Sequence, residues 1–496
     1  MRRCLCILIA NILLLTLVGC RETSPDVPSQ PGTQPVTPPP ETTVPQLISL
    51  PYDQTASLDP YATTSRINAD LATLLYEQLV FWDDAWMPQP QLAQSFVAEG
   101  GVLTVILREG AVFSDGSPVT AADVVYSYGK AAASTQYKAL VSVFTACRAE
   151  GQQTAVFTLR NGGENAAAAL AFPIVKKPDK KSAPTPPIGS GVYTLSQDGT
   201  SLVRNVHNTA NTSNTTVRLY HVDREDMLLH TLESGHVTYY FDTLSDGTLP
   251  RSSKAGLAVE MPYLVYLGIN GYSVTPPAVR QALSHAIDRT TLVQSAYKGY
   301  ARAAVTPFHP LWKRTAGLYT FSAVASVSKA DALLESAGYR GNANSKKKEL
   351  KLELIYVQGN DFKESVVQAI VQQMAAVCVT VTPVALSYNE YLSRLQNGRY
   401  QLYLGEIRLP HVSDLSALFS GAAAYGVRAD GAAAAAYTQY ANGSGSLDAF
   451  LAAFGEDMPF IPLCYRKGQV LFHRFLGTVA PLANNVYYRL EQWTVS

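Results

Sequence analysis

The chain contains 496 residues, 47% hydrophobic and 16% charged, which is ample apolar sequence for a large core and too long for one ordinary domain. Lys plus Arg and Asp plus Glu each number 39, so the charge balance does not indicate a nucleic-acid partner. The six cysteines form no CxxC pair, and no HExxH, GxxxxGK[ST] or GxGxxG string occurs. The sequence therefore predicts neither a metal site built by the protein nor a nucleotide or other cofactor.

Residues 1–19 have the pattern of a secretory signal peptide. Arg2 and Arg3 form a positive start, and the apolar run over 4–18 is shorter than the ~20 residues that cross a bilayer. The run ends Leu17-Val18-Gly19-Cys20, which resembles a bacterial lipobox. That resemblance implies cleavage before Cys20, lipidation of its thiol and a lipid anchor in the membrane. The alternative is an ordinary signal peptide that happens to contain a cysteine.

Residues 20–46 read as a tether that starts at the lipidated cysteine. The segment contains eight prolines among Ser, Thr, Gln and acidic residues, and it lacks the apolar side chains needed for a core. At ~3.1 Å per residue, a polyproline II conformation would let it reach up to ~80 Å. We expect the folded body to begin at residue 47.

The sequence of the first part of the body predicts a helix, a strand and a second helix. Leucines 71, 74, 75 and 79 form one helical face after Asn68, which has the residue type of an N-cap. Val102–Leu107 predicts a strand. Thr120 is predicted to cap the next helix, with Asp123 in the capping-box position.

The second half of the body predicts alternating strands and helices. An apolar strand over 263–270 precedes a helix whose buried stripe runs from Val279 to Ile287. A strand over 350–357, a helix over 361–377 and a strand over 379–386 form a βαβ unit, which predicts a parallel pair. The other predicted elements are a helix from Tyr388 closed by Gly398, a strand over 400–409, an Ala-rich helix over 422–440 and a late strand over 458–463.

Several short segments, in this order, resemble the peptide/nickel-binding family of ABC-transporter solute-binding proteins. "LREGAVFSDGSPVTAADVVYSY" (107–128) is similar to that family's signature segment, and "VRQALSHAIDRTTLV" (279–293) is a second strong match. "IGSGVY" (188–193) and "MPFIPL" (458–463) also resemble segments of the family. The ordered matches extend over most of the chain after the tether.

This resemblance implies an α/β, two-lobe periplasmic-binding-protein-like fold (type II), with a subdomain inserted in the first lobe. We expect lobe I over 47–265 with the insertion at about 66–185, lobe II over 266–460, and a return to lobe I over 461–496. The resemblance implies a monomeric, lipid-anchored protein on the extracytoplasmic face, with no catalytic residues. It would bind oligopeptides between its lobes and deliver them to the permease subunits of an ABC importer. A metal-chelate or sugar receptor of the same fold is the alternative.

Four residues near the end of the predicted 400–409 strand are candidate ligand contacts. Peptide-binding relatives hold the ligand's α-amino group with an acidic residue in this region, but the Trp and the acidic register of their motif are missing here. Glu406 and Arg408 share one face of a strand, so they could present a carboxylate and a guanidinium to a zwitterionic ligand. Asp414 is the second candidate carboxylate, and His411 leaves open a metal chelate of the nickel type. The alternatives are an ordinary ion pair for Glu406 and Arg408 and a surface position for His411.

One string leaves an enzymatic reading open. Ser326-Val327-Ser328-Lys329 matches the S-x-x-K nucleophile motif of penicillin-binding proteins. No KTG or SDN partner occurs, and Ser328 is better explained as the N-cap of a helix over 329–337, with Asp331 in the capping-box position. We therefore predict no enzymatic activity.

Overall fold

A computed structural model describes residues 47–161, 165–179, 186–210, 212–318, 320–411, 414–420 and 425–496. The predicted signal peptide, Cys20 with its predicted lipidation, and the predicted tether lie outside these residues. Within them, no helix combines the length and apolar character required to cross a membrane. Cys147, Cys378 and Cys464 are free thiols.

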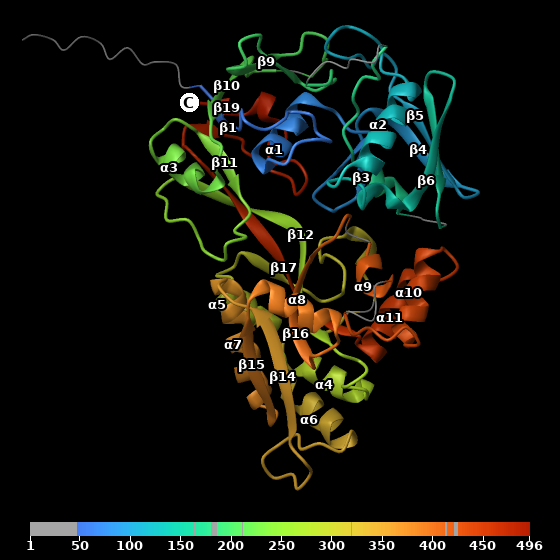
Figure 1. The fold of residues 1–496 in the computed structure, drawn as a ribbon, viewed down its shortest axis with the longest axis vertical. Helices are drawn as coiled ribbons and strands as arrows, with labels where there is room; N and C mark the ends of the chain where they lie inside the picture. The colour runs from blue at the N-terminus through green and yellow to red at the C-terminus, as the bar shows by residue number, and fades with distance from the viewer. Residues whose placement is uncertain are drawn as a thin grey trace, which may run out of the picture. The chain divides into compact units, whose positions relative to one another are not determined.

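The largest sheet joins seven strands from the second half of the chain and from residues 239–269 (Figure 1). Its order is β11-β17-β12-β16-β14-β15, and the short strand β13 pairs with residues 464–466 in the middle of β17. Most of its neighbours are antiparallel, but β14 is parallel to both β15 and β16. The strands are β11 (Tyr239–Asp242), β12 (Ala255–Ile269), β13 (Ala301–Ala303), β14 (Leu350–Val357), β15 (Val379–Leu386), β16 (Leu402–Arg408) and β17 (Phe460–Phe472).

Strands β12 and β17 are the longest of these and run side by side, green and red in Figure 1. Their register is interrupted at two places, and the larger interruption is between Glu260, which pairs with Lys467, and Leu264, which pairs with Tyr465. Three residues of β12 therefore face a single residue of β17, which makes a bulge that contains Pro262. The bulge separates the part of the sheet next to β11 from the part next to β16.

The predicted βαβ unit is confirmed. Helix α7 (Asp361–Ala375) connects β14 to β15, and the two strands pair in parallel from Leu350 and Val379 onward. The helix ends two residues before the predicted position. The apolar stripe of 279–287 is also confirmed, since these side chains are buried in helix α4 (Pro277–Ala286) and its C-cap.

Two four-stranded sheets and a hairpin form the N-terminal part of the body. One sheet has the order β1-β10-β9-β8, and the other, which carries helix α2 on β6 and β7, has the order β4-β5-β7-β6. Their elements are β1 (Ser49–Tyr52), β2 (Val80–Trp82), β3 (Pro88–Pro90), β4 (Ala93–Glu99), β5 (Val102–Leu107), α2 (Ala121–Ala133), β6 (Phe144–Glu150), β7 (Thr154–Leu159), β8 (Tyr193–Leu195), β9 (Ser201–Arg204) and β10 (Thr216–His221). The other elements are α1 (Arg66–Leu75), α3 (Leu228–Glu233), α5 (Arg289–Ala296), α6 (Val327–Ser336), α8 (Tyr388–Gln396), α9 (Ser416–Ser420), α10 (Ala432–Ala441), α11 (Leu447–Asp457), β18 (Leu476–Gly477) and β19 (Thr494–Val495).

The predicted capping box of α2 is confirmed. The Asp123 carboxylate accepts hydrogen bonds from the Thr120 N–H at 2.8 Å and from the Thr120 hydroxyl at 2.6 Å. Its second oxygen accepts the Lys177 N–H at 2.7 Å. The start of this helix is therefore fastened to a segment more than fifty residues further along the chain.

Two predicted caps are wrong. Asn68 lies inside α1, which Ser65 precedes, and its buried amide donates to the Asp53 carbonyl at 2.8 Å while its oxygen accepts the Asp53 N–H at 3.0 Å. It therefore holds the preceding loop. Ser328 lies exposed in the first turn of α6, because the helix begins directly after Ser326.

The predicted Ala-rich helix starts later than expected. Helix α10 begins at Ala432, and residues 422–424 of the predicted range lie outside the described residues. Gly426 has φ +74°, a left-handed conformation that interrupts a helix. Alanine favours a helix, but the left-handed conformation of Gly426 prevents a helix from continuing through this position, so α10 begins only after it.

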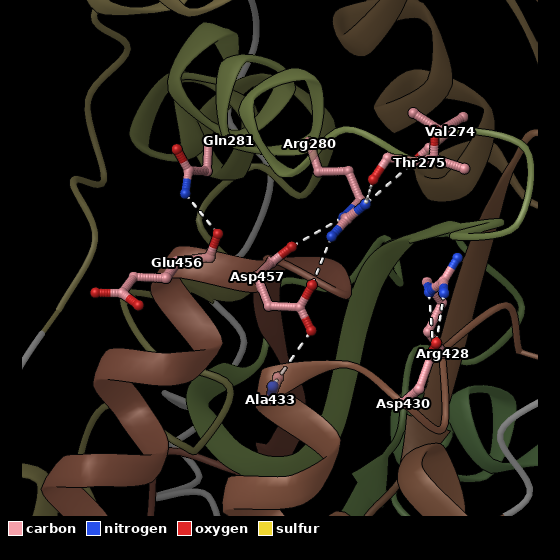
Figure 2. A network of polar contacts seen from close by, with 9 residues as sticks. All are labelled: Val274, Thr275, Arg280, Gln281, Arg428, Asp430, Ala433, Glu456 and Asp457. Carbon is pink, nitrogen blue, oxygen red and sulfur yellow. Dashed lines mark hydrogen bonds and ion pairs between the residues drawn. The ribbon is translucent and has the colours of Figure 1, made fainter.

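A buried arginine fixes the ends of α4, α10 and α11 together (Figure 2). Arg280 donates to the Asp457 carbonyl at 2.8 Å and to its carboxylate at 2.5 Å. It also donates to the carbonyls of Val274 and Thr275. The second Asp457 oxygen accepts the Ala433 N–H at 3.2 Å. The guanidinium is thus fully engaged inside the protein, and it stabilises the fold around the candidate site.

Candidate functional site

A cavity of about 600 Å³ brings together three segments that are far apart in the sequence. The first comes from the 3-10 helix η1 (Leu140–Val143), the residues that follow β7 and the start of the 3-10 helix η2 (Ala166–Leu170). The second comes from residues 314–318, and the third from 411–416 and from the helices α10 and α11 with the turn between them. Its volume is within the roughly 300–1,000 Å³ typical of small-molecule sites. The described lining residues are Ser142, Val143, Arg160, Asn161, Asn165, Ala166, Arg314, Leu318, His411, Asp414, Ser416, Tyr437, Tyr440, Ala441, Gly443, Gly445, Ser446, Leu447 and Asp448.

Both signs of charge line this cavity. Arg160 and Asp448 line it without an ion-pair partner among the described residues, although the Arg160 Nε–H donates to the Ser142 carbonyl at 3.0 Å. Asp448 lies in the first turn of α11, which Ser446 caps by accepting the Ala449 N–H. A guanidinium and a carboxylate on one cavity, neither of them ion-paired with another described residue, suit a ligand that carries both charges.

Two of the four predicted contacts, His411 and Asp414, line the cavity. His411 is buried, and burial lowers the pKa of its imidazole despite the opposing charge of Asp414. One Asp414 oxygen accepts the Ser416 N–H at 2.8 Å and lies 3.4 Å from the Tyr437 hydroxyl. These contacts fix the carboxylate at the start of α9.

The other two predicted contacts, Glu406 and Arg408, do not line it. Glu406 is ion-paired, with Oε1 at 3.0 Å from Arg466 and Oε2 at 3.2 Å from Lys363. Arg408 is exposed at the end of β16, opposite Tyr263 of β12. A direct role of either residue in ligand binding stays a prediction.

Aromatic side chains form the wall next to α10. Tyr437 stacks on Phe419, with ring centroids 4.5 Å apart, and accepts the Leu415 N–H at 2.9 Å. Tyr440 is parallel to Phe450 at 6.0 Å. Rings held in this way give a ligand a rigid apolar surface with polar tips.

Hydrogen bonds centred on Asn165 bridge the cavity walls. Its amide nitrogen lies 2.6 Å from the Tyr440 hydroxyl, and its oxygen accepts from Arg314 at 3.0 Å. The sequence analysis missed Asn165, Arg160, Arg314 and Asp448, because nothing in their local pattern distinguishes them from surface residues. Tyr437 and Tyr440 had a weak signal, as large side chains three apart on an Ala-rich helix.

Two other cavities are weaker candidates. One, of about 1,140 Å³, lies over α5, α7 and residues 247–251, and the other, of about 550 Å³, lies between α4, residues 320–322 and the end of α11. Neither contains any of the four predicted contacts. No group of three or more His, Cys, Asp or Glu side chains within the described ranges is placed to hold a metal ion.

Comparison with known proteins identifies related sequences and folds. A family model described as "Bacterial extracellular solute-binding proteins, family 5 Middle" matches residues 87–421. The oligopeptide-binding protein AppA of Bacillus subtilis (strain 168) is 23% identical over 356 residues, which cover 64% of this chain and 65% of that relative. The chain thus matches slightly less than two thirds of that relative's length.

Solved structures extend the likeness to most of the chain. The unliganded open form of MppA, a periplasmic murein tripeptide binding protein, superposes with a TM-score of 0.72 at 19% identity and covers 91% of this chain and 98% of its own. A nickel ABC transporter structure from Bacillus halodurans gives a TM-score of 0.72 at 18% identity, with 90% and 99% covered. At these identities the likeness shows the fold alone.

Proposed function

Because this chain belongs to family 5 of the bacterial extracellular solute-binding proteins, we propose that it binds a short peptide in the 600 Å³ cavity and delivers it to an ABC importer. The family is not enzymatic, and the fold is the mixed α/β fold of periplasmic binding proteins. The S-x-x-K string therefore has its structural explanation at the start of α6.

The observation that carries the proposal is the pair of opposite charges on the cavity wall. Arg160 would bind the ligand's terminal carboxylate, and Asp448, with Asp414 as a second carboxylate on the same cavity, would bind the α-amino group. Tyr437 and Tyr440 would cover the backbone between these ends. The volume suits a ligand of a few residues.

Closure of two lobes would hold the ligand. We propose the division into lobes that the resemblance implies. Lobe I comprises residues 47–265 and 461–496, with the inserted subdomain at about 66–185, and lobe II comprises residues 266–460. The cavity takes lining residues from both sides of this division, at Arg160 and at Asp448. Ligand contacts made only when the lobes meet would favour the closed state over the open state.

Calorimetry of the purified protein with a panel of dipeptides and tripeptides tests the proposal. Arg160→Gln and Asp448→Asn should each weaken binding at least about tenfold, as expected for the loss of a charge-assisted hydrogen bond. Arg148→Gln is the matched control, because Arg148 lies on β6, does not line the cavity, is exposed and pairs with Glu150. Equal affinities in all three variants would contradict the assignment of the site.

A metal chelate is the competing ligand class, because His411 is buried on the cavity wall. A nickel–histidine complex that bound while every peptide failed would replace the peptide assignment. His411→Gln should then abolish binding, whereas Arg160→Gln should not.

The lipid anchor needs its own experiment. We propose that Cys20 is lipidated and holds the body at the extracytoplasmic face through the tether. Cells fed a labelled fatty acid should incorporate it into the wild-type protein and not into the Cys20→Ser variant, which should leave the membrane fraction. Unchanged membrane association of the variant would rule the anchor out.

A further inference from the structure

The hairpin β2–β3 carries a tryptophan in an unusual conformation at its tip. Trp86 has φ +56°, in the left-handed region that a bulky side chain rarely enters, yet its side chain is buried at 3% exposure. The Asp83 carboxylate holds the turn by accepting the N–H groups of Ala85 and Met87, each at 2.9 Å. A strained backbone that the surroundings keep in place is a recurrent property of functional positions.

Trp86 packs against a segment that is more than two hundred residues away in the sequence. Its ring stacks on His309 with centroids 4.2 Å apart and an interplanar angle of 30°. Beside this stack the Lys313 N–H donates to the Ala85 carbonyl at 3.1 Å. One ring contact and one main-chain hydrogen bond thus fasten the segment His309–Arg314 to the hairpin.

The contacts of His309 favour a neutral imidazole that lies flat against the Trp86 ring. Its Nδ1 accepts the Leu311 N–H at 3.2 Å, which places the proton of the neutral ring on Nε2. That nitrogen lies 3.4 Å from Glu260, whose carboxylate also binds Arg302 and Lys467. Tyr465 covers the ring edge at 4.7 Å. Burial lowers the pKa of His309, which favours the neutral form.

The far end of the same segment is part of the cavity. Arg314 lines the cavity and donates to the Asn165 oxygen at 3.0 Å, and Asn165 in turn contacts Tyr440. The five residues from His309 to Lys313 therefore connect the buried stack to the cavity wall. A shift of His309 cannot leave Arg314 in place unless the short chain between them rearranges.

We propose that Trp86 is a positioning residue for the cavity: its stack on His309 fixes the segment His309–Arg314 and so sets ligand affinity, although Trp86 does not line the cavity. The proposal rests on the function proposed above only in naming the cavity as the ligand site. The positioning itself is a property of the protein without ligand.

A pair of variants tests this inference on the full chain. Trp86→Leu fills most of the space but removes the stacking ring, whereas Trp86→Phe keeps a ring for His309. We expect Trp86→Leu to bind the tripeptide trialanine roughly threefold to tenfold more weakly, the range that corresponds to the loss of one buried aromatic pair. Trp86→Phe should remain close to the wild type.

Amide hydrogen exchange at Lys313 gives a readout that does not need a ligand. Its exchange should become faster in Trp86→Leu and stay slow in Trp86→Phe, because this N–H bonds to Ala85 beside the stack. Unchanged exchange in Trp86→Leu would overturn the inference, and so would faster exchange with unchanged trialanine affinity. Failure of the wild type to bind trialanine would count against the proposed function, whereas the exchange comparison would still decide whether Trp86 holds the segment.

His309→Asn provides a second route if Trp86→Leu does not fold. The Asn oxygen can accept the Leu311 N–H in an Asx turn, but it offers Trp86 no ring. It should show the same faster exchange and the same weaker trialanine binding. A wild-type result for both measurements in this variant would also overturn the inference.

Discussion

Arg466 of β17 and Glu406 of β16 form an ion pair across the intervening strand β12, with Nη2 3.0 Å from Oε1 and with side chains that are 6% and 16% exposed. Arg466 also donates to the Thr243 carbonyl at 3.0 Å and lies 5.0 Å above the Tyr263 ring. Lys363 of α7 reaches the other Glu406 oxygen. One carboxylate thus joins β16, β17 and α7.

Glu406→Gln should therefore destabilise the protein. Removal of one partner of a buried pair leaves an uncompensated charge, which costs about 3 kcal/mol of the free energy of unfolding. Urea unfolding at pH 7 measures this change. Glu150→Gln is the control, since the Arg148–Glu150 pair is exposed and should contribute nothing measurable. Equal unfolding midpoints for the two variants would contradict the prediction.

Glu260 should make the protein sensitive to acid. Burial raises the pKa of this carboxyl, but the contacts with His309, Arg302 and Lys467 outweigh burial and lower the pKa to about 2, from 4.5. The unfolded chain then binds the proton more readily, so the stabilisation is complete above pH 4.5 and is lost as the pH falls toward 2. A lowering of the pKa of this size corresponds to a few kcal/mol of the free energy of unfolding, on the order of 3 kcal/mol.

Unfolding of the wild type and of Glu260→Gln between pH 7 and pH 3 checks this sign. The wild type should be the more stable protein at pH 7, and its advantage should shrink as the pH falls below 4.5. A constant difference between the two profiles would show that Glu260 does not titrate in this way.

The Arg280 network of Figure 2 predicts a large effect at Asp457. Asp457→Ala leaves the Arg280 guanidinium, whose side chain is 3% exposed, without its counter-charge, which should cost roughly 3–5 kcal/mol. Asp430→Ala is the matched control in the same view, because its pair with Arg428 is exposed. It should unfold like the wild type. A similar loss in both variants would indicate a general effect of charge rather than the buried contact.

Gly268 should not tolerate a side chain. It pairs with Tyr403 across β12 and β16, and a Cβ added at Gly268 would lie 2.0 Å from atoms of the Tyr403 ring. Gly268→Ala should therefore cost roughly 1–3 kcal/mol through overpacking. The same substitution in a Tyr403→Ala background should cost almost nothing, and a double-mutant cycle of unfolding free energies measures the coupling. Additive effects would contradict the proposed clash.

Local signals predicted the elements well, and long-range contacts account for the errors. Thr120 with Asp123 and the unit from Leu350 to Leu386 are determined by residues close in sequence. Asn68 has the residue type of a cap, but a loop that folds back onto it uses its amide instead. Such a contact has no signature in the neighbouring sequence.

The residues of the cavity also show that contacts between distant parts of the chain cannot be predicted from local sequence. His411 and Asp414, which line the cavity, could be named as candidate contacts because they lie in a segment that the resemblance marks. Arg160 and Asp448 are nearly 300 residues apart, and only the fold brings them to one cavity. The sequence offers no reason to prefer either of them over the other exposed charges.

The bulge at Pro262 has a mechanical consequence. On one side of the bulge, residues 255–260 of β12 pair with residues 467–472 of β17. On the other side, residues 264–268 of β12 pair with residues 460–465 of β17, and residues 263–269 pair with β16. Between these two parts, β12 and β17 lack regular residue pairing, so we expect the sheet to bend most easily there. If the proposed lobes move apart when a solute leaves, this bulge in the longest described strand is where the sheet would bend most easily, and a substitution that restored regular pairing there should stiffen the sheet.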